Sequence, residues 1–248
     1  MKKRIVSLVG GLMLFAAGTA GADHRLLVTD VLDPGKLDAA IAWEWARSAE
    51  ESFTGSAIGF SVGAGVAKNL EVSVSAPYVL FNKLKWFSTD SGWGDLTVAA
   101  KYKILDENPF TLTAGLGVTL DTGSSRFSSG DTEYSPLIAI SKDLGHETKP
   151  YFAYKPVLRG EDQLDTHTIR IGIEKELNHL VTFDGSFDMA FYSGGGAHDL
   201  REYTLDLATY LQLAKNFYLI PSAGFSYITV ESEDATAWTL GTALYYMF

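Results

Sequence analysis

Strict alternation of apolar residues with polar or small residues runs through successive segments of about ten residues along most of the chain. This two-residue period is typical of a β-strand whose two faces meet different environments. The sequence therefore predicts an all-β protein with an even number of strands. The twelve predicted strands are 38–47, 56–66, 70–80, 95–105, 109–120, 133–143, 150–159, 166–177, 180–192, 200–213, 217–230 and 236–248.

The connections between these strands alternate between two kinds. One kind is a tight turn rich in Asn, Asp, Gly and Pro, the residues expected at hairpins. The other kind is a longer polar loop, and the alternation predicts an up-and-down meander with all its short turns at one end. The tight turns are 68–69, 106–109, 145–149, 178–179 and 215–216, and the longer loops include 81–94, 121–131, 159–165, 194–199 and 231–235.

The number of strands decides which way the apolar faces point. Side chains or one small ligand fill a barrel of about eight strands, so a barrel of twelve cannot bury a solid apolar core. The apolar faces must then meet lipid, which predicts a transmembrane antiparallel up-and-down β-barrel of twelve strands. Ten or fourteen strands are the alternatives if one hairpin is misread, and Pro150 and Pro156 mark one place where the ladder is interrupted.

Aromatic residues on the predicted outward faces gather near the two ends of the strands. Two girdles of aromatic side chains, one near each end of the strands, are typical of outer-membrane barrels, because these amphipathic side chains favour the lipid headgroup zone. The last strand ends the chain on an alternating apolar face of Leu244, Tyr246 and Phe248, which resembles the signal read by barrel-assembly machinery. The predicted girdle residues are Trp45, Tyr78, Tyr102, Phe110, Tyr134, Phe191, Tyr203, Phe217, Tyr227, Trp238 and Tyr246.

The N-terminus has the pattern of a secretory signal peptide over residues 1–22. A basic start is followed by the apolar run 5–17 and by the small residues Ala20 to Ala22. We expect residues 37–248 to form a barrel in the outer membrane of a Gram-negative bacterium, with both termini in the periplasm. Residues 23–36 form a periplasmic N-terminal segment, either a flexible leader or a stretch that folds into the bore.

Composition excludes several classes of function. The chain has no cysteine, so a disulfide scaffold, a zinc ribbon and a thiol enzyme are ruled out. Its net charge is −10, and removal of residues 1–22 takes away three basic residues, which leaves 17 − 30 = −13. Such a balance argues against nucleic-acid binding. The predicted partners are outer-membrane lipid and lipopolysaccharide, the barrel-assembly machinery and a small solute, and neither a cofactor nor a metal is predicted.

No catalytic residues are predicted. The sequence Gly59-Phe60-Ser61-Val62-Gly63 matches G-x-S-x-G, but it lies within a strand, whereas a nucleophile elbow needs a turn from strand into helix. By strand arithmetic no serine has a histidine beside it on the same face. The sequence therefore predicts a protein that is not an enzyme, with an outer-membrane lipid-modifying enzyme as the least favoured alternative.

The predicted inward faces carry charges of both signs, seven acidic and five basic. As a channel, this wall forms an aqueous passage for small solutes that prefers cations or neutral molecules to anions. As a plugged structural or interaction barrel, the same charges form ion pairs that fill the lumen. The predicted lumen-lining residues are Glu44, Glu71, Asp95, Lys101, Lys103, Lys155, Arg159, Arg170, Glu174, Asp184, Asp188, Asp206, Tyr210 and Tyr245.

Three stretches of the chain resemble a widespread Gram-negative family of outer-membrane barrels, labelled phenol-degradation meta-pathway proteins or transporters. They are Asp23 to Lys36, the Gly92-Trp93-Gly94-Asp95-Leu96 run leading to Tyr102, and Gly117 to Gly123. The opening departs from the family pattern at Val31 to Pro34. The resemblance implies passive uptake of small solutes, aromatic or hydrophobic ones among them, and it brings no catalytic residues.

Overall fold

The computed structural model describes residues 28–49, 53–84, 87–89, 91–125, 127–160, 163–194, 200–230 and 233–248. The predicted signal peptide, residues 1–22, lies outside the described residues. Among the described residues no helix is long and apolar enough to cross a membrane.

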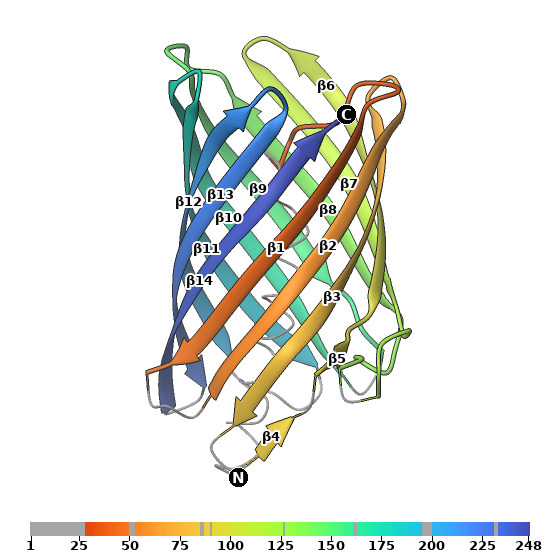
Figure 1. The fold of residues 1–248 in the computed structure, drawn as a ribbon, viewed down its shortest axis with the longest axis vertical. Helices are drawn as coiled ribbons and strands as arrows, with labels where there is room; N and C mark the ends of the chain where they lie inside the picture. Colours follow the sequence, from red (N-terminus) through yellow and green to blue (C-terminus); the bar gives the residue numbers. More distant parts are fainter. Residues whose placement is uncertain are drawn as a thin grey trace.

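Twelve long antiparallel strands close into one barrel, which confirms the predicted fold class and strand number (Figure 1). Most strand boundaries fall within two or three residues of the predicted ones. The strands of the wall are β1 (Leu37–Ser48), β2 (Phe53–Ala67), β3 (Leu70–Leu84), β6 (Leu96–Glu107), β7 (Phe110–Leu120), β8 (Glu133–Lys142), β9 (Thr148–Val157), β10 (Leu164–Asn178), β11 (Val181–Gly194), β12 (Arg201–Ala214), β13 (Phe217–Val230) and β14 (Glu233–Met247).

The first and last strands close the barrel. β1 pairs with β14 over eleven register positions, from Asp38 opposite Met247 to Ser48 opposite Ala237. The backbone N–H of Phe248 also donates to the carbonyl of Leu37, at 2.8 Å. Closure leaves neither strand with a free edge, which lipid could not satisfy by hydrogen bonding.

The predicted loop 81–94 is partly a pair of short strands. β4 (Phe87–Thr89) and β5 (Gly92–Trp93) both pair with β3, which itself continues to Leu84. Val79 lies opposite Ala57 and Phe81 lies opposite Ser56, so β3 carries an extra residue at this point. This bulge breaks the two-residue period, which explains why the alternation ends at Leu80 although the strand does not.

The tight turns lie at the rim of the barrel where β14 ends (Figure 1). Asn69 joins β2 to β3 with φ of 66°, and Asn216 joins β12 to β13 with φ of 63°. Asparagine tolerates this left-handed conformation better than most residues with a side chain, so both positions suit a tight hairpin.

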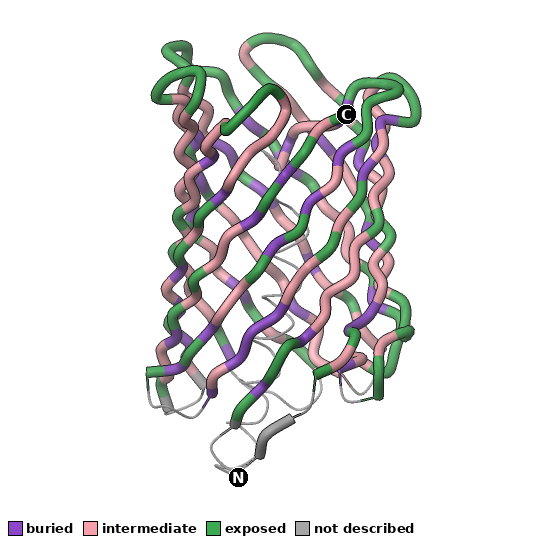
Figure 2. The backbone as a smooth tube through the Cα atoms, viewed as in Figure 1, coloured by how far each residue is buried: buried purple, intermediate pink, exposed green. Residues whose placement is uncertain are grey.

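The two faces of the wall differ in residue type. Exposed residues alternate with more buried ones along the strands in Figure 2. The outward faces carry large apolar side chains, such as Val62 and Ile171 with exposed fractions of 57% and 51%. The inward faces carry small residues, among them Ala139 and Ala243, which are fully buried. All eleven predicted girdle residues lie on outward faces, and Trp43 and Trp93 join them there although the sequence analysis did not include them.

We expect Phe248→Asp to lower the fraction of folded barrel several-fold without lowering the amount of protein made. Phe248 is largely exposed on the outward face and its ring lies 4.6 Å from that of Tyr246. A carboxylate there interrupts the terminal apolar pattern that the assembly machinery is predicted to read. Heat-modifiable mobility on gels measures the folded fraction. Lys215→Asp, which puts a carboxylate in the exposed turn between β12 and β13, serves as the control; equal folded fractions for both variants would contradict the prediction.

Candidate functional site

The structure places most of the predicted lumen residues on the inward faces of the strands. Their positions share the two-residue period of the buried residues Ala139 and Ala243. Two predicted residues, Asp95 and Arg159, lie in the connections just outside β6 and β9. The inward residues are Glu44, Glu71, Lys101, Lys103, Lys155, Arg170, Glu174, Asp184, Asp188, Asp206, Tyr210 and Tyr245.

Arg170 of β10 and Asp188 of β11 form a bidentate ion pair on the inner wall. The guanidinium donates from Nε to Oδ1 of Asp188 at 2.8 Å and from Nη2 to Oδ2 at 2.7 Å. On the neighbouring strands the Tyr151 hydroxyl donates to Oδ1 of Asp184 at 3.0 Å. These contacts hold two carboxylates and one cation in fixed positions at the wall.

Asp206 of β12 and Glu44 of β1 continue this group of charges around the bore. Asp206 lies within electrostatic range of Arg170, Asp188 and Asp184, and Glu44 lies within range of Asp206. The carboxylates of Asp184, Asp188 and Asp206 thus lie near Arg170, and Glu44 lies near Asp206. We call Glu44, Asp184, Asp188, Asp206 and Arg170 the acidic belt.

Glycines make room for the belt side chains to lie along the wall. A Cβ on Gly224 would lie only 2.4 Å from Oδ1 of Asp206, and a Cβ on Gly172 would lie 2.3 Å from Cζ of Tyr151. Larger residues at these positions would push both side chains toward the middle of the bore. These two glycines therefore allow Asp206 and Tyr151, the partner of Asp184, to lie along the inner wall.

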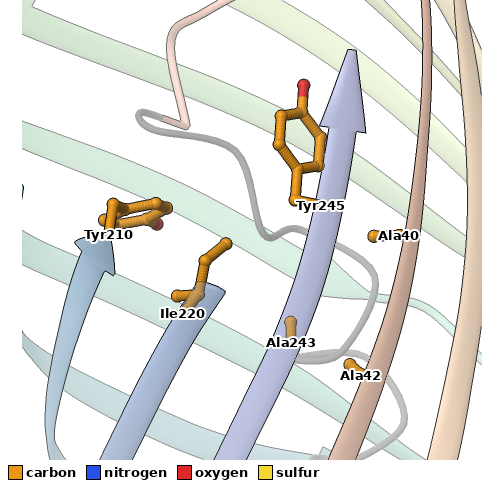
Figure 3. Close-up of a cluster of buried hydrophobic side chains, with 6 residues drawn as sticks. All are labelled: Ala40, Ala42, Tyr210, Ile220, Ala243 and Tyr245. Carbon is orange, nitrogen blue, oxygen red and sulfur yellow. The ribbon is translucent and has the colours of Figure 1, made fainter. Parts of the chain in front are cut away.

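An apolar cluster lines the inner wall between the belt and the short-turn rim (Figure 3). It comes from β12, β13, β14 and β1, and within it the Tyr245 hydroxyl donates to Oδ2 of Asp38 at 3.0 Å. The sequence analysis included its two tyrosines but missed the apolar members, although the same inward period identifies them. We call Ala40, Ala42, Tyr210, Ile220, Ala243 and Tyr245 the tyrosine cluster.

A second apolar cluster lines the inner wall near the long-loop rim. Phe53 and Leu200 are almost completely buried in it. It lies on the same side of the barrel as the tyrosine cluster, so the two apolar clusters are separated by the belt along the bore. We call Ala46, Phe53, Leu200, Ile228 and Ala237 the mouth cluster.

Residues 28–36 fold into the bore, which decides between the two alternatives for the described part of the N-terminal segment. The turn ahead of β1 is held on β2 by the Gly35 N–H, which donates to the carbonyl of Gly65 at 2.8 Å. The Leu32 N–H donates to Oε2 of Glu71 on β3 at 2.9 Å. This end of the segment is therefore held against the inner faces of β2 and β3.

The other end of this segment reaches the far side of the bore. Thr29 is fully buried, its carbonyl accepts from Oγ1 of Thr113 on β7 at 2.7 Å, and its hydroxyl lies 3.0 Å from that of Ser141 on β8. A Cβ on Gly65 would lie 2.0 Å from the carbonyl oxygen of Asp33, so only glycine lets the segment sit this close to β2. Residues 28–36 thus cross the bore near the short-turn rim.

Asp95 accepts hydrogen bonds from the loop that follows β7. It is not a lumen-lining residue of a strand, which corrects the sequence prediction. β6 begins one residue later, and the Asp95 carboxylate accepts from the backbone N–H groups of Thr122, Gly123 and Ser129 at 2.8 to 3.1 Å. The Ser128 hydroxyl adds a fourth donor at 3.1 Å. Burial raises the pKa of Asp95, but these hydrogen bonds outweigh that effect and hold its pKa below the usual range.

Arg159 also belongs to the mouth. Its Nε donates to Oε1 of Glu133 at 2.7 Å, and Nη1 donates to the carbonyl of Leu164 at 2.6 Å. Lys103, near the opposite rim, has its Nζ 3.4 Å from Oδ2 of Asp106, three residues later in β6. Arg170, by contrast, forms an ion pair with the belt carboxylate of Asp188.

One serine does lie beside a histidine, contrary to the sequence prediction. His167 of β10 has Nδ1 2.8 Å from the Tyr154 hydroxyl and Nε2 3.5 Å from Oγ of Ser193. Ser193 is not directly opposite His167 in the register but two residues away, and a long side chain spans this diagonal. All three residues are on outward faces near the long-loop rim. Among the described residues no group of three His, Asp or Glu side chains is placed to hold a metal ion.

Comparison with known proteins confirms the resemblance drawn from the sequence. Residues 34–148 match the family model described as "Putative MetA-pathway of phenol degradation". No curated protein matches the sequence. The COG4313 outer membrane channel from Pseudomonas putida F1 has a similar fold, with a TM-score of 0.74 and 13% identity over 89% of this chain and 98% of that one.

Two further solved structures are similar in fold. The KdgM porin superposes with a TM-score of 0.54 and 14% identity, over 82% of this chain and 97% of that chain. The CymD monoaromatic hydrocarbon channel superposes with a TM-score of 0.50 and 10% identity, over 87% and 88% of the two chains. These structures are outer-membrane barrels, which places this chain among them by fold.

We expect Asp95→Asn to loosen the loop that follows β7, because an amide nitrogen cannot accept from the Ser129 N–H or the Ser128 hydroxyl. Each lost charge-assisted bond costs about 2 kcal/mol of local stability. Trypsin cleavage after Arg126, which the loop sequence contains, measures the effect, and the variant should be cut several times faster. Asp143→Asn, in the turn between β8 and β9, is the control; equal cleavage rates for Asp95→Asn and the wild type would rule out this role.

The same carboxylate gives a dependence on pH. A group whose pKa is lowered by folding stabilises the fold above its unfolded pKa, and that contribution is lost as the pH falls through the folded pKa. Protection of the Thr122, Gly123 and Ser129 amides from hydrogen exchange should therefore persist at pH values where a free aspartate, with a pKa of about 3.9, is half protonated. Loss of protection already above that pH would contradict the assignment.

Proposed function

We propose that this protein is an outer-membrane channel for passive uptake of small solutes that combine an apolar or aromatic body with a neutral or cationic polar group. Both termini lie in the periplasm and the longer loops face the outside. The observation that carries the proposal is the layered inner wall: the mouth cluster, then the acidic belt, then the tyrosine cluster.

Each layer suits one part of such a solute. The apolar clusters offer contact to a ring or a short chain, because burying apolar surface is favourable at about 25 cal/mol per Å². The belt offers hydrogen-bond acceptors to a polar group, and its four carboxylates outnumber its one cation, Arg170, which disfavours anions. A monoaromatic hydrocarbon channel is among the proteins of similar fold, which supports aromatic solutes as one class.

A plugged barrel is the second candidate, and one observation favours it. Residues 28–36 cross the bore and are bonded to β2, β3, β7 and β8. In the channel these residues narrow the passage on one side, and solutes pass between them and the tyrosine cluster. In the plugged barrel they block it, so single-channel conductance of the purified protein in a planar bilayer separates the two.

Replacing Asp184 and Asp188 by Asn should move the reversal potential under a salt gradient from the cation side toward zero. The double change removes two belt carboxylates and leaves the Arg170 guanidinium without its bidentate partner. Glu107→Gln, at the end of β6, with Glu147→Gln, in the turn before β9, removes the same charge from exposed positions and should leave the potential close to that of the wild type. An unchanged potential in a folded, conducting double variant would place the selective constriction elsewhere.

Gly65→Ala should increase single-channel conductance at least about twofold, because the added Cβ collides with the carbonyl of Asp33 and displaces residues 28–36 from β2. Gly117→Ala is the matched control. It adds the same atom to the inner wall, but the nearest atom lies 3.5 Å away. The role of the segment in narrowing the bore would be refuted by equal conductance of the Gly65→Ala variant and the wild type.

A further inference from the structure

Two carboxylates of the acidic belt, Glu44 and Asp206, accept no hydrogen bond from the described part of the chain. Glu44 lies deep within the barrel with protein on most of its sides, yet part of it remains accessible from the bore. The other two belt carboxylates are bound, since Asp188 holds Arg170 and Asp184 accepts from Tyr151. A charge inside a protein is normally paired, so Glu44 and Asp206 are the belt acceptors that a molecule in the bore can use.

The register places these two carboxylates on opposite sides of a patch of small residues. Glu44 of β1 lies opposite Gly241 of β14, and Asp206 of β12 lies opposite Gly224 of β13. Gly224 in turn lies opposite Thr239, which is two residues from Gly241. The two glycines are therefore diagonal neighbours on the inner face, at a distance of about 7–8 Å.

Both carboxylate side chains extend over this patch. A Cβ on Gly224 would lie 2.4 Å from Oδ1 of Asp206, and a Cβ on Gly241 would lie 4.0 Å from Cγ of Glu44. The same Cβ on Gly241 would lie 2.7 Å from Oγ of Ser222, which places a hydroxyl between the two acids. We call Glu44, Asp206, Ser222, Gly224 and Gly241 the twin-carboxylate site.

The site carries more negative than positive charge. Arg170 is within electrostatic range of Asp206, but its guanidinium forms a bidentate pair with Asp188, which leaves that pair close to neutral. A cation in the bore is therefore attracted to the site, and an anion is repelled.

The number and type of acceptors favour an organic ammonium group over a metal ion. Two carboxylates and one hydroxyl match the three N–H donors of a primary ammonium group. Two carboxylates about 7–8 Å apart leave room for a nitrogen that donates to both. A metal ion fits less well, because no three His, Asp or Glu side chains in the described ranges are placed to hold one.

Apolar wall begins next to the site, on the side of the short-turn rim. Ala42 is the inward residue before Glu44, and Ala243 is the inward residue after Gly241; both belong to the tyrosine cluster. Successive inward residues of a strand are about 6.8 Å apart, so a short chain of carbon atoms spans the step. The two tyrosine rings of the cluster, drawn in Figure 3, offer contact to an aromatic ring at that level.

We propose that the twin-carboxylate site binds the primary ammonium group of an arylalkylamine whose aromatic ring lies against the tyrosine cluster. The inference rests on the proposed channel function and narrows its solutes to amines that carry a ring on a chain of two or three carbon atoms. Charge-assisted hydrogen bonds to the two carboxylates hold the ammonium group. The neutral alcohol of the same shape lacks this attraction, and the corresponding carboxylic acid is repelled.

The first test compares three solutes of similar shape by isothermal titration calorimetry of the purified, folded barrel in a zwitterionic detergent at neutral pH. We expect 2-phenylethylamine, which is protonated at this pH, to bind at least about tenfold more tightly than 2-phenylethanol. The alcohol has the same ring and chain, so it also measures uptake of the ring by detergent. The anion 3-phenylpropionate should bind no more tightly than the alcohol.

The second test removes the acceptors one at a time without changing the shape of the wall. Glu44→Gln and Asp206→Asn should each weaken binding of 2-phenylethylamine at least about tenfold and leave binding of 2-phenylethanol unchanged. Glu202→Gln is the matched control, because Glu202 lies on the same face of β12 but accepts from the Tyr192 hydroxyl. It removes the same charge and should change the affinity by less than about twofold. Heat-modifiable mobility on gels checks that all variants are folded.

The outcomes distinguish the site from the channel. A barrel that conducts ions but binds the amine no more tightly than the alcohol refutes the site and leaves the proposed function intact. A barrel that binds the amine as expected but shows no single-channel conductance refutes the channel and leaves the site. Equal losses of affinity in Glu44→Gln, Asp206→Asn and Glu202→Gln would also refute the site, because the amine would then respond only to the overall charge of the lumen.

Discussion

Inside the hydrocarbon layer, a backbone N–H or C=O group that has no partner in the protein finds no water to replace it. This constraint explains why all twelve long strands belong to one closed hydrogen-bonded ladder and why the first strand must pair with the last. The eleven paired positions between β1 and β14, extended by the bond from Phe248 to Leu37, complete that ladder. The inner wall then comes as a consequence, since every second side chain of a closed ladder has to point into the bore.

The hydrogen-bonded ladder is interrupted between β8 and β9. The facing residues Pro136 and Pro156 leave residues 135–137 of β8 and 155–157 of β9 without ladder pairing to each other. Residues 28–36 add to this picture because they occupy the other end of the bore through bonds to four strands.

The fold could be predicted from the sequence because strand number, strand face and turn position are all local patterns. The alternation failed where a bulge at Val79 to Phe81 changed its phase and hid the end of β3 and the short strands β4 and β5. The charged belt was also predictable, since Arg170, Asp184 and Asp188 follow the inward period.

Contacts across the bore were not predictable in this way. Thr29 meets Ser141 over 112 residues of sequence, and Asp95 collects donors from a loop more than 25 residues away. A local alternation of residue types carries no information about contacts between residues so far apart in the sequence. The facing of Pro136 and Pro156 likewise depends on the register of one hairpin, which the sequence alone did not fix.

The tight turns at one rim bear on how such a chain can diverge. A one-residue insertion at Asn69 or Asn216 would shift the pairing of a hairpin and turn its apolar face from lipid toward the bore. The longer connections at the other rim absorb added residues without changing any register. Homologous chains should therefore keep their lengths at the short-turn rim and accumulate insertions at the opposite one, so that evolution can reshape the long-loop rim while the short-turn rim stays constant.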